Sequence, residues 1–266
     1  MLAEKQTDVR GKAAQLIAHV VDRVRRARVE HKPFFHLRLD HVFPDDIYAA
    51  MLRAMPAEAN YRPLAGRSNE NMRSDGSFTR VKIDLFPEYI RHLSPEQQPI
   101  WDIVGRALCS SEVQNAFIEA LAEPLQQRFG KDFRQIGMYP IPVLTRDTPG
   151  YSIIPHVDTP WKGITVQLYL PGNDKAPHLG TVFHNQAPDG ALTRGAQMPF
   201  VPNSGYAFAV VDGTVHSADT VGNEVQSRDS ILLTYFVDAG LQRFLRNRGK
   251  RWGNFVLNEM RSLARR

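Results

Sequence analysis

Two histidines and one aspartate in the second half of the chain have the residue types and spacing of a metal site. His156 and Asp158 are separated by one residue, so in an extended segment both side chains point to the same side. His216 follows much later, after a strand-like run that ends in an Asp212-Gly213 turn. A folded sheet can return this histidine to the first pair. We therefore predict one metal ion held by His156, Asp158 and His216.

The make-up of this ligand set indicates which metal it prefers. Two imidazoles and one carboxylate on one face leave the opposite face of the ion open for other ligands. That facial arrangement is the one used by non-haem Fe(II) oxygenases. The His-x-Asp spacing by itself is weak evidence, and His216 alone would be better explained as a hydrogen-bonded histidine at a strand end. The three together predict Fe(II).

Arg228 is the second residue that could take part in the chemistry of a site. It stands at the head of the apolar run Ile231–Phe236, where a buried guanidinium is costly without an anion. A dicarboxylate ligand supplies that anion through a bidentate contact. Ser230 lies on the same side of the strand and can donate a further hydrogen bond. The alternative is an internal salt bridge between Arg228 and Asp212 or Asp219.

Other polar and aromatic residues are weaker candidates. Trp161, Arg146 and Arg80 are expected to contact the substrate, against simpler interpretations as packing, a solvated loop and surface charge. His178 and His184 lie in the same half of the chain. We interpret them as a loop residue and a strand-end residue rather than as metal ligands.

The order His-x-Asp, distal His and Arg-x-Ser resembles the core of the Fe(II)/2-oxoglutarate dioxygenases, over roughly residues 133–240. The closest likeness is to the prolyl-hydroxylase-like branch. Two runs carry it: Tyr139-Pro140 with Gly150-Tyr151 before the His-x-Asp pair, and Thr165 to Leu170 followed by Gly180 to Phe183. Departures from the pattern are a longer Asp158-to-His216 segment and Leu179-Gly180 in place of two glycines.

The resemblance implies a fold, a reaction and further site residues. The fold is α+β, with a double-stranded β-helix core of the jelly-roll or cupin-like type. The cofactor set is Fe(II) with 2-oxoglutarate and O₂ as co-substrates, and ascorbate as a stimulant. Tyr169 matches a tyrosine that contacts the distal carboxylate of 2-oxoglutarate, and Tyr139 one near its metal-bound end. The implied activity is hydroxylation or desaturation of a small molecule, such as an amino acid or natural-product intermediate, with release of succinate and CO₂.

Three other functions remain compatible with these residues. One is a peptidyl or protein hydroxylase with the same cofactors. The second is a cupin-type metal enzyme that does not use 2-oxoglutarate and needs no arginine on its last strand. The third is a non-catalytic binding module whose basic tail contacts an acidic partner, although an intact metal triad argues against it.

Hydrophobic periodicity places helices early and strands late in the chain. Helical spacing covers 8–30, about 44–55, 96–108, 112–128 and 254–265, and 60–77 is expected to be a loop. Strand-like runs cover 34–40, 79–85, 135–144, 163–170, 180–184, 206–211 and 230–237. We therefore expect a helix-rich region at 1–132 packing on a catalytic core at 133–240, with a basic C-terminal helix at 241–266, all in one structural domain.

Composition bounds the remaining possibilities. The chain has 266 residues and a formal net charge of +5, with eight basic residues and one acid in 241–266. The rest is slightly acidic, so nucleic acid is not an expected partner, and the basic tail is expected to be solvated. One cysteine, Cys109, excludes an internal disulfide. The sequence has no long apolar run, so we expect a cytoplasmic protein that does not bind membranes.

Overall fold

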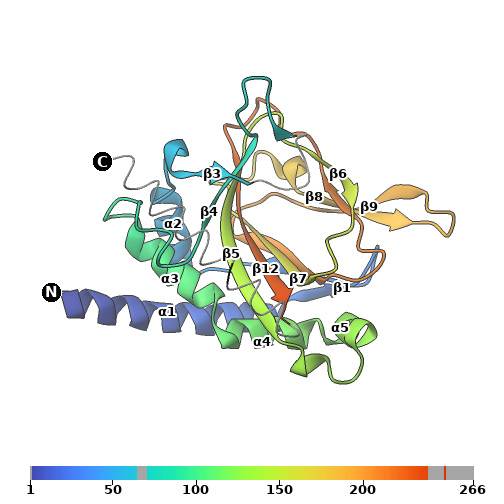
Figure 1. Cartoon of the computed structure of the whole chain (residues 1–266), viewed down its shortest axis with the longest axis horizontal. Helices are drawn as coiled ribbons and strands as arrows, with labels where there is room; N and C mark the ends of the chain where they lie inside the picture. Colours follow the sequence, from blue (N-terminus) through green and yellow to red (C-terminus); the bar gives the residue numbers. More distant parts are fainter. Residues whose placement is uncertain (1, 65–70, 239–248, 250–266) are drawn as a thin grey trace.

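The computed structural model describes residues 2–64, 71–238 and 249 of the chain. In this part of the chain helices pack against one side of a large antiparallel sheet, and a smaller antiparallel sheet faces its other side (Figure 1). No described helix is long and apolar enough to cross a membrane. The expected α+β class is confirmed, and the predicted terminal helix at 254–265 lies outside the described residues.

The large sheet has the order β1-β2-β10-β7-β12-β5-β4-β3. Its two longest strands are β12 (Arg228–Val237) and β5 (Met138–Asp147), which pair along their whole length. The remaining strands are β7 (Lys162–Tyr169), β10 (Ser204–Ala209), β2 (His36–Asp40), β1 (Arg28–Glu30), β4 (Arg80–Asp84) and β3 (Arg62–Pro63). Four of these precede residue 133, so the helix-rich region also supplies both edges of this sheet.

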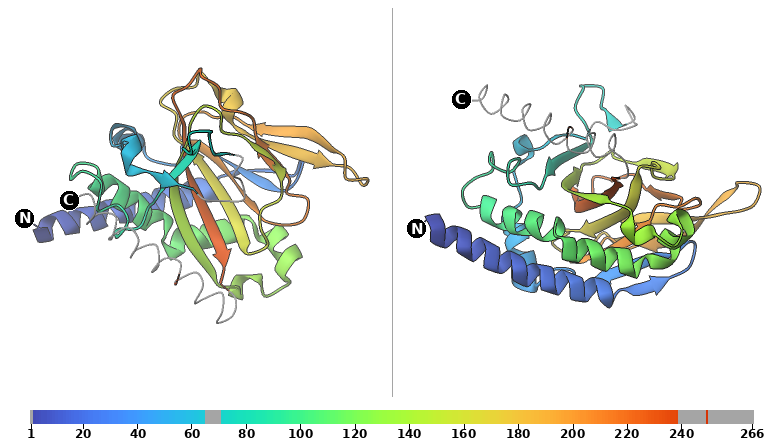
Figure 2. Two further views of the ribbon diagram at one scale, coloured as in Figure 1. Left: turned by 45° about the horizontal axis from the view of Figure 1, so that its top comes forward. Right: turned by 60° about the horizontal axis from the view of Figure 1, so that its bottom comes forward.

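The small sheet has the order β6-β11-β8-β9. Its strands are β6 (Ile153–His156), β11 (His216–Ala218), β8 (Thr181–Gln186) and β9 (Leu192–Met198). The β8–β9 hairpin extends away from the body of the molecule (Figures 1 and 2). Aromatic residues from both sheets, among them Phe183, Tyr206 and Phe208, pack together between them.

The helical layer consists of α1 (Leu2–Arg25), α2 (Asp45–Arg53), α3 (Gln98–Leu108), α4 (Ser111–Ala120) and α5 (Ala122–Phe129). In α3 the apolar residues recur at helical spacing, and Trp101, Val104 and Leu108 are fully buried. They belong to one core with Leu144, Ile231 and Leu233 of the sheet. Figure 2 shows α1 and the α3–α4 pair running together along this side of the sheet.

Strand alternation separates this core from the second face of the sheet. Leu144 of β5 and Ile231 and Leu233 of β12 face the helices. Their neighbours Val143 and Leu232 face the small sheet and line a cavity. One strand pair therefore provides both the main core and the floor of a pocket.

The structure differs from the periodicity in identifiable places. The first helix ends at Arg25, because Arg28–Glu30 pair with β2 as a strand. The single helix expected at 112–128 is two helices that meet at Leu121. Pro124 cannot donate the backbone hydrogen bond that would continue the first of them. Strands β6, β9 and β11 were not anticipated, because they are short or largely exposed and lack an apolar pattern.

The close packing of α3 gives a test of this architecture. A Cβ atom added to Gly105 would lie 2.2 Å from the backbone oxygen of Leu85, whereas Gly11 in α1 is exposed with no atom nearby. We expect Gly105→Ala to lower the free energy of unfolding by about 1–3 kcal/mol through overpacking. The matched change Gly11→Ala should raise it by about 0.5–1 kcal/mol through helix propensity. Urea denaturation of both variants measures this, and effects of the same sign would contradict the packing described.

Candidate active site

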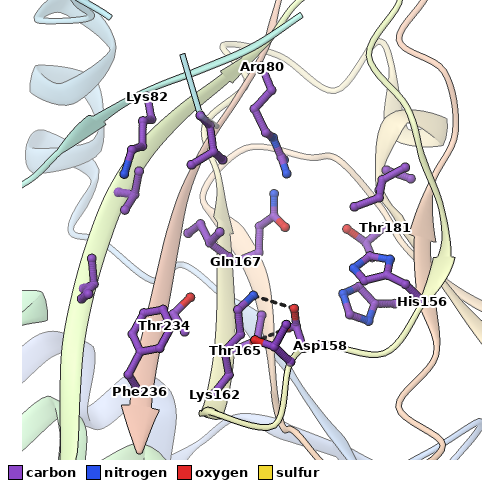
Figure 3. Close-up of a pocket in the computed structure, with 18 of the residues that line it drawn as sticks. Arg80, Lys82, His156, Asp158, Lys162, Thr165, Gln167, Thr181, Thr234 and Phe236 are labelled. Carbon is purple, nitrogen blue, oxygen red and sulfur yellow. Dashed lines mark hydrogen bonds and ion pairs between the residues drawn. The ribbon is translucent and has the colours of Figure 1, made fainter. Parts of the chain in front are cut away.

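A cavity of about 510 Å³ lies between the two sheets. Strands β4, β5, β12 and β7 form its floor, and β6, β8 and β11 supply residues from the other side. Figure 3 shows the arrangement, with Arg80 and Lys82 entering from β4 at the top, His156 on the right, and Asp158 below them next to Lys162 and Thr165. The volume is typical of a small-molecule site.

The predicted metal ligands meet in this cavity. His156 and His216 are direct cross-strand partners in the pairing of β6 with β11, and their ring centroids are 4.4 Å apart. Asp158 follows β6 by two residues. One ligand atom of each of the three residues lies within 4.8 Å of the others.

Hydrogen bonds orient both histidines as ligands. Nδ1 of His156 lies 2.9 Å from the carbonyl oxygen of Ile154, and Nδ1 of His216 lies 3.0 Å from that of Thr214. A carbonyl oxygen only accepts, so each Nδ1 carries the proton and each Nε2 keeps its lone pair. Backbone carbonyl oxygens fix the tautomer of metal-binding histidines in this way. Two such imidazoles with a carboxylate fit an Fe(II) ion well.

Asp158 is held in its charged form. Its carboxylate accepts hydrogen bonds from Lys162 Nζ at 2.5 Å and from Thr165 Oγ1 at 2.6 Å. Burial opposes ionisation, but the charges of Lys162 and His216 and the two hydrogen bonds outweigh it and lower the pKa of Asp158 to about 2. The carboxylate is therefore a fixed anion before any metal binds.

A second polar group lies at the Arg228 end of the cavity. Arg228 is 1% exposed and donates to Asp147 Oδ2 at 2.8 Å, to the carbonyl oxygen of Leu179 and to Thr181 Oγ1. Arg80 donates to both oxygens of the same carboxylate, at 2.6 and 3.0 Å. Arg80, Asp147 and Arg228 are neighbours across β4, β5 and β12. Two guanidinium groups thus share one carboxylate and leave a positive charge facing the cavity.

The internal partner of Arg228 is therefore Asp147, not the Asp212 or Asp219 considered from the sequence. Asp219 instead binds Arg194 at 2.9 Å. The salt bridge does not neutralise the site, because Asp147 is already held by Arg80.

The residues assigned from the resemblance occupy different positions relative to the cavity. Tyr139 lines it. Tyr169 and Ser230 are buried outside the cavity lining. The Tyr169 hydroxyl hydrogen-bonds Thr181 N and Oγ1, and Ser230 Oγ contacts Thr145 and Gln167. Both support the lining residue Thr181 or Gln167, so direct contact of Tyr169 or Ser230 with a co-substrate remains a prediction.

Of the three predicted substrate contacts, Trp161 and Arg80 line the cavity and Arg146 does not. Arg146 is next to Asp147 on β5, so its side chain points to the opposite face of the sheet. There it pairs with Asp229 at 2.8 Å and lies over the ring of Tyr61. His178 pairs with Glu224 and His184 with Ser217, and neither is part of the metal cluster.

Several lining residues were missed by sequence reasoning. Lys162, Thr181, Gln167 and Tyr206 all line the cavity, and the Tyr206 hydroxyl donates to Gln167 at 3.0 Å. Their only sequence signal is a polar residue at an alternate position of an apolar strand. That signal is weak for a single strand. It becomes informative only when the strand pairing is known and places polar residues of neighbouring strands side by side.

Removal of one imidazole tests the metal site. We expect His216→Ala to weaken Mn(II) or Fe(II) binding by at least about 100-fold, because an inner ligand is lost together with its fixed orientation. His184→Ala, which removes a buried histidine of β8 outside the cluster, should bind the ion as the native chain does. Anaerobic titration calorimetry measures both, and equal affinities for the two variants would contradict the assignment.

His216 should also make the metal-free protein sensitive to acid. Burial lowers the pKa of His216 from 6.5 to about 4. Between these values the unfolded chain binds a proton that the folded chain does not, so stability falls as the pH drops from 6.5 to 4 and this contribution levels off below 4. The effect is on the order of 3 kcal/mol at most. Urea denaturation in chelator from pH 7.5 to 4 should show a shallower slope for His216→Gln, and parallel profiles would contradict it.

A search of solved structures found similar chains, whereas no family model matches the chain and no curated protein matches its sequence. A prolyl 4-hydroxylase from Phytophthora capsici is 15% identical with a TM-score of 0.52, over 94% of this chain and 75% of that one. A prolyl 4-hydroxylase from Pseudomonas putida is 19% identical (TM-score 0.49; 84% and 98% covered). A 2OG-Fe(II) oxygenase family member from Burkholderia pseudomallei is 14% identical (TM-score 0.47; 83% and 89% covered). At these identities the likeness concerns the fold, and the chain has the fold of the Phytophthora capsici prolyl 4-hydroxylase.

Proposed function

We propose that this protein is an Fe(II)- and 2-oxoglutarate-dependent oxygenase that hydroxylates or desaturates a small molecule. Its two facing sheets then form the double-stranded β-helix predicted from the motifs. The observation that carries the proposal is the pairing of two groups in one cavity. The His156–Asp158–His216 cluster offers a facial metal site, and the Arg80–Asp147–Arg228 group offers a positive charge for a dicarboxylate.

Bound Fe(II) with 2-oxoglutarate supplies the oxidising chemistry, in which O₂ and 2-oxoglutarate are consumed and succinate and CO₂ are released. The chain contributes binding and orientation. His156, Asp158 and His216 hold the ion on one face. Arg228 attracts the far carboxylate of 2-oxoglutarate, and Thr181 and Tyr206 are hydroxyl groups beside it in the lining.

Hydrogen bonds within the lining keep these groups in place. The Tyr206 hydroxyl lies 3.0 Å from Thr181 Oγ1, and Thr181 N donates to the Tyr169 hydroxyl at 2.8 Å. Thr165 and Lys162 of β7 fix the Asp158 carboxylate by hydrogen bonds to its two oxygens. In this proposal Arg80 acts mainly through Asp147, whose charge it balances and whose orientation it sets.

Two alternatives are distinguished by specific observations. A cupin-type metal enzyme without 2-oxoglutarate has no use for a buried, charged arginine in its cavity, so Arg228 favours the oxygenase. A peptidyl hydroxylase would use the same ion and co-substrate. The cavity volume of about 510 Å³ favours a small substrate, and 40% exposure of Trp161 is the feature most compatible with a larger one.

The central test is succinate formation. Enzyme, Fe(II), 2-oxoglutarate and ascorbate are incubated with a metabolite panel and, separately, with proline-containing peptides. We expect metabolite-stimulated succinate release and a product that has gained one oxygen atom or lost two hydrogens. Stimulation by the peptides alone would replace the small-molecule assignment with the peptidyl hydroxylase. Substrate conversion without succinate would favour the cupin-type enzyme.

The two faces of the β5–β12 pair provide a matched test of the co-substrate anchor. Arg228 pairs with Asp147 on the cavity face, and Arg146 pairs with Asp229 on the other face of the same two strands. Loss of a charged hydrogen-bonded contact is worth about 1.5–3 kcal/mol, so Arg228→Met should weaken 2-oxoglutarate binding by about 10- to 100-fold. Arg146→Met should leave that affinity unchanged.

Binding is measured calorimetrically on Mn(II)-loaded protein, and retained Mn(II) affinity shows that each variant is folded. If both arginine variants bind 2-oxoglutarate equally, Arg228 is a structural residue and the co-substrate assignment loses its anchor.

A further inference from the structure

We propose that the substrate of this enzyme carries an anionic group, a carboxylate in the simplest case, and that Lys82 on β4 binds it. This inference rests on the proposed oxygenase function and concerns the part of the cavity that neither the metal cluster nor the Arg228 group occupies. The argument uses the charge balance of the lining, the position of Lys82 and the character of the surrounding walls.

The cavity carries more positive than negative charge. Four cationic side chains line it among the described residues, namely Arg80, Lys82, Lys162 and Arg228, against the carboxylates Asp84 and Asp158. Behind the lining, Asp147 adds one negative charge and Arg62, bound to Asp84, adds one positive charge. A divalent metal ion and doubly charged 2-oxoglutarate cancel each other, so the excess of positive charge counted over these described residues remains. A further anion would balance it.

Three of these four cations already have a role at the proposed reaction centre. Lys162 holds Asp158, and Arg228 and Arg80 share Asp147. Lys82 is the remaining cation, and it belongs to a separate group. Its Nζ lies 3.0 Å from Asp84 Oδ1, while Arg62 binds the other oxygen of Asp84. One carboxylate thus lies between two cations, and of these Lys82 is the one that lines the cavity.

The position of Lys82 suits a substrate that must reach the metal. It enters the cavity from β4, and His156 lies on the far side of the same space (Figure 3). Lys82 pairs with Thr145 of β5. This pair lies two residues along the strands from the Arg80–Asp147 pair, on the same face of the sheet. A substrate anchored there extends across the cavity, beside the site proposed for 2-oxoglutarate.

The apolar part of the cavity lining determines what the rest of the substrate can be. The rest of the cavity lining is largely apolar and aromatic and includes Phe86, Tyr89, Ile141, Leu232 and Phe236. A buried charge in such surroundings is stabilised by an ion pair, and apolar surfaces gain from burial of a matching apolar body. The expected substrate is therefore a small acid with an aliphatic or aromatic body.

Acid and amide pairs of the same shape test the proposal. We use 3-phenylpropionate, L-phenylalanine, 4-methylpentanoate and the amide of each. Binding to protein loaded with Zn(II) and 2-oxoglutarate is measured calorimetrically, so this readout does not depend on turnover. In the native chain we expect the best-bound acid to bind about 10- to 100-fold more tightly than its amide. Lys82→Met should remove this preference, and Lys82→Arg should retain part of it.

Lys175→Met is the control, because it deletes the same charge from an exposed loop and should leave the preference unchanged. Affinities for Zn(II) and 2-oxoglutarate should be the same in all variants, which shows that each is folded. Equal binding of acids and amides, no binding of any acid, or an acid preference that survives Lys82→Met overturns the inference.

The two proposals fail in different ways. A Lys82-dependent acid preference without any succinate release would remove the oxygenase assignment and leave the anion site. Succinate release stimulated equally by acids and amides would support the oxygenase and overturn the role of Lys82.

Discussion

The cavity depends on one buried carboxylate, that of Asp147. It is fully buried and receives hydrogen bonds from Arg80 on β4 and Arg228 on β12, so it joins three adjacent strands at the same level of the sheet. A lone charge there would be costly, and a single arginine would leave a neutral pair. Two arginines on one carboxylate give a positive group that is held rigidly and faces the space between the sheets.

The metal cluster is built on a similar principle from the other sheet. The pairing of β6 with β11 places His156 opposite His216, and the two backbone carbonyls fix both rings before an ion arrives. Asp158 is fixed by Lys162 and Thr165 of β7, a strand of the large sheet. The three ligands therefore depend on both sheets, and a shift of one sheet against the other would separate them.

The helical layer makes this arrangement possible without contributing ligands. Helices α1, α3 and α4 bury the face of the large sheet that points away from the cavity, with Leu144, Ile231 and Leu233 in the shared core. Hydrophobic burial on that face stabilises the long β5 and β12 strands. Those strands can then carry charged and polar residues on their other face, although such residues add little to the stability of the sheet.

The sequence by itself predicted the His156–Asp158–His216 cluster and most of the helices and long strands, because short-range spacing and strand alternation are local properties. It also located Arg228 and Tyr139. It did not determine that 28–30 would form a strand or that 112–128 would break, because pairing with β2 and the missing N–H of Pro124 outweighed periodicity. The two Arg/Asp pairs show the limit most clearly. Arg146-Asp147 and Arg228-Asp229 are equivalent by sequence, yet the register of β5 on β12 turns Arg228 toward the cavity and Arg146 away from it. That choice is made by which face of the strand pair the helices cover, so only the tertiary structure decided it.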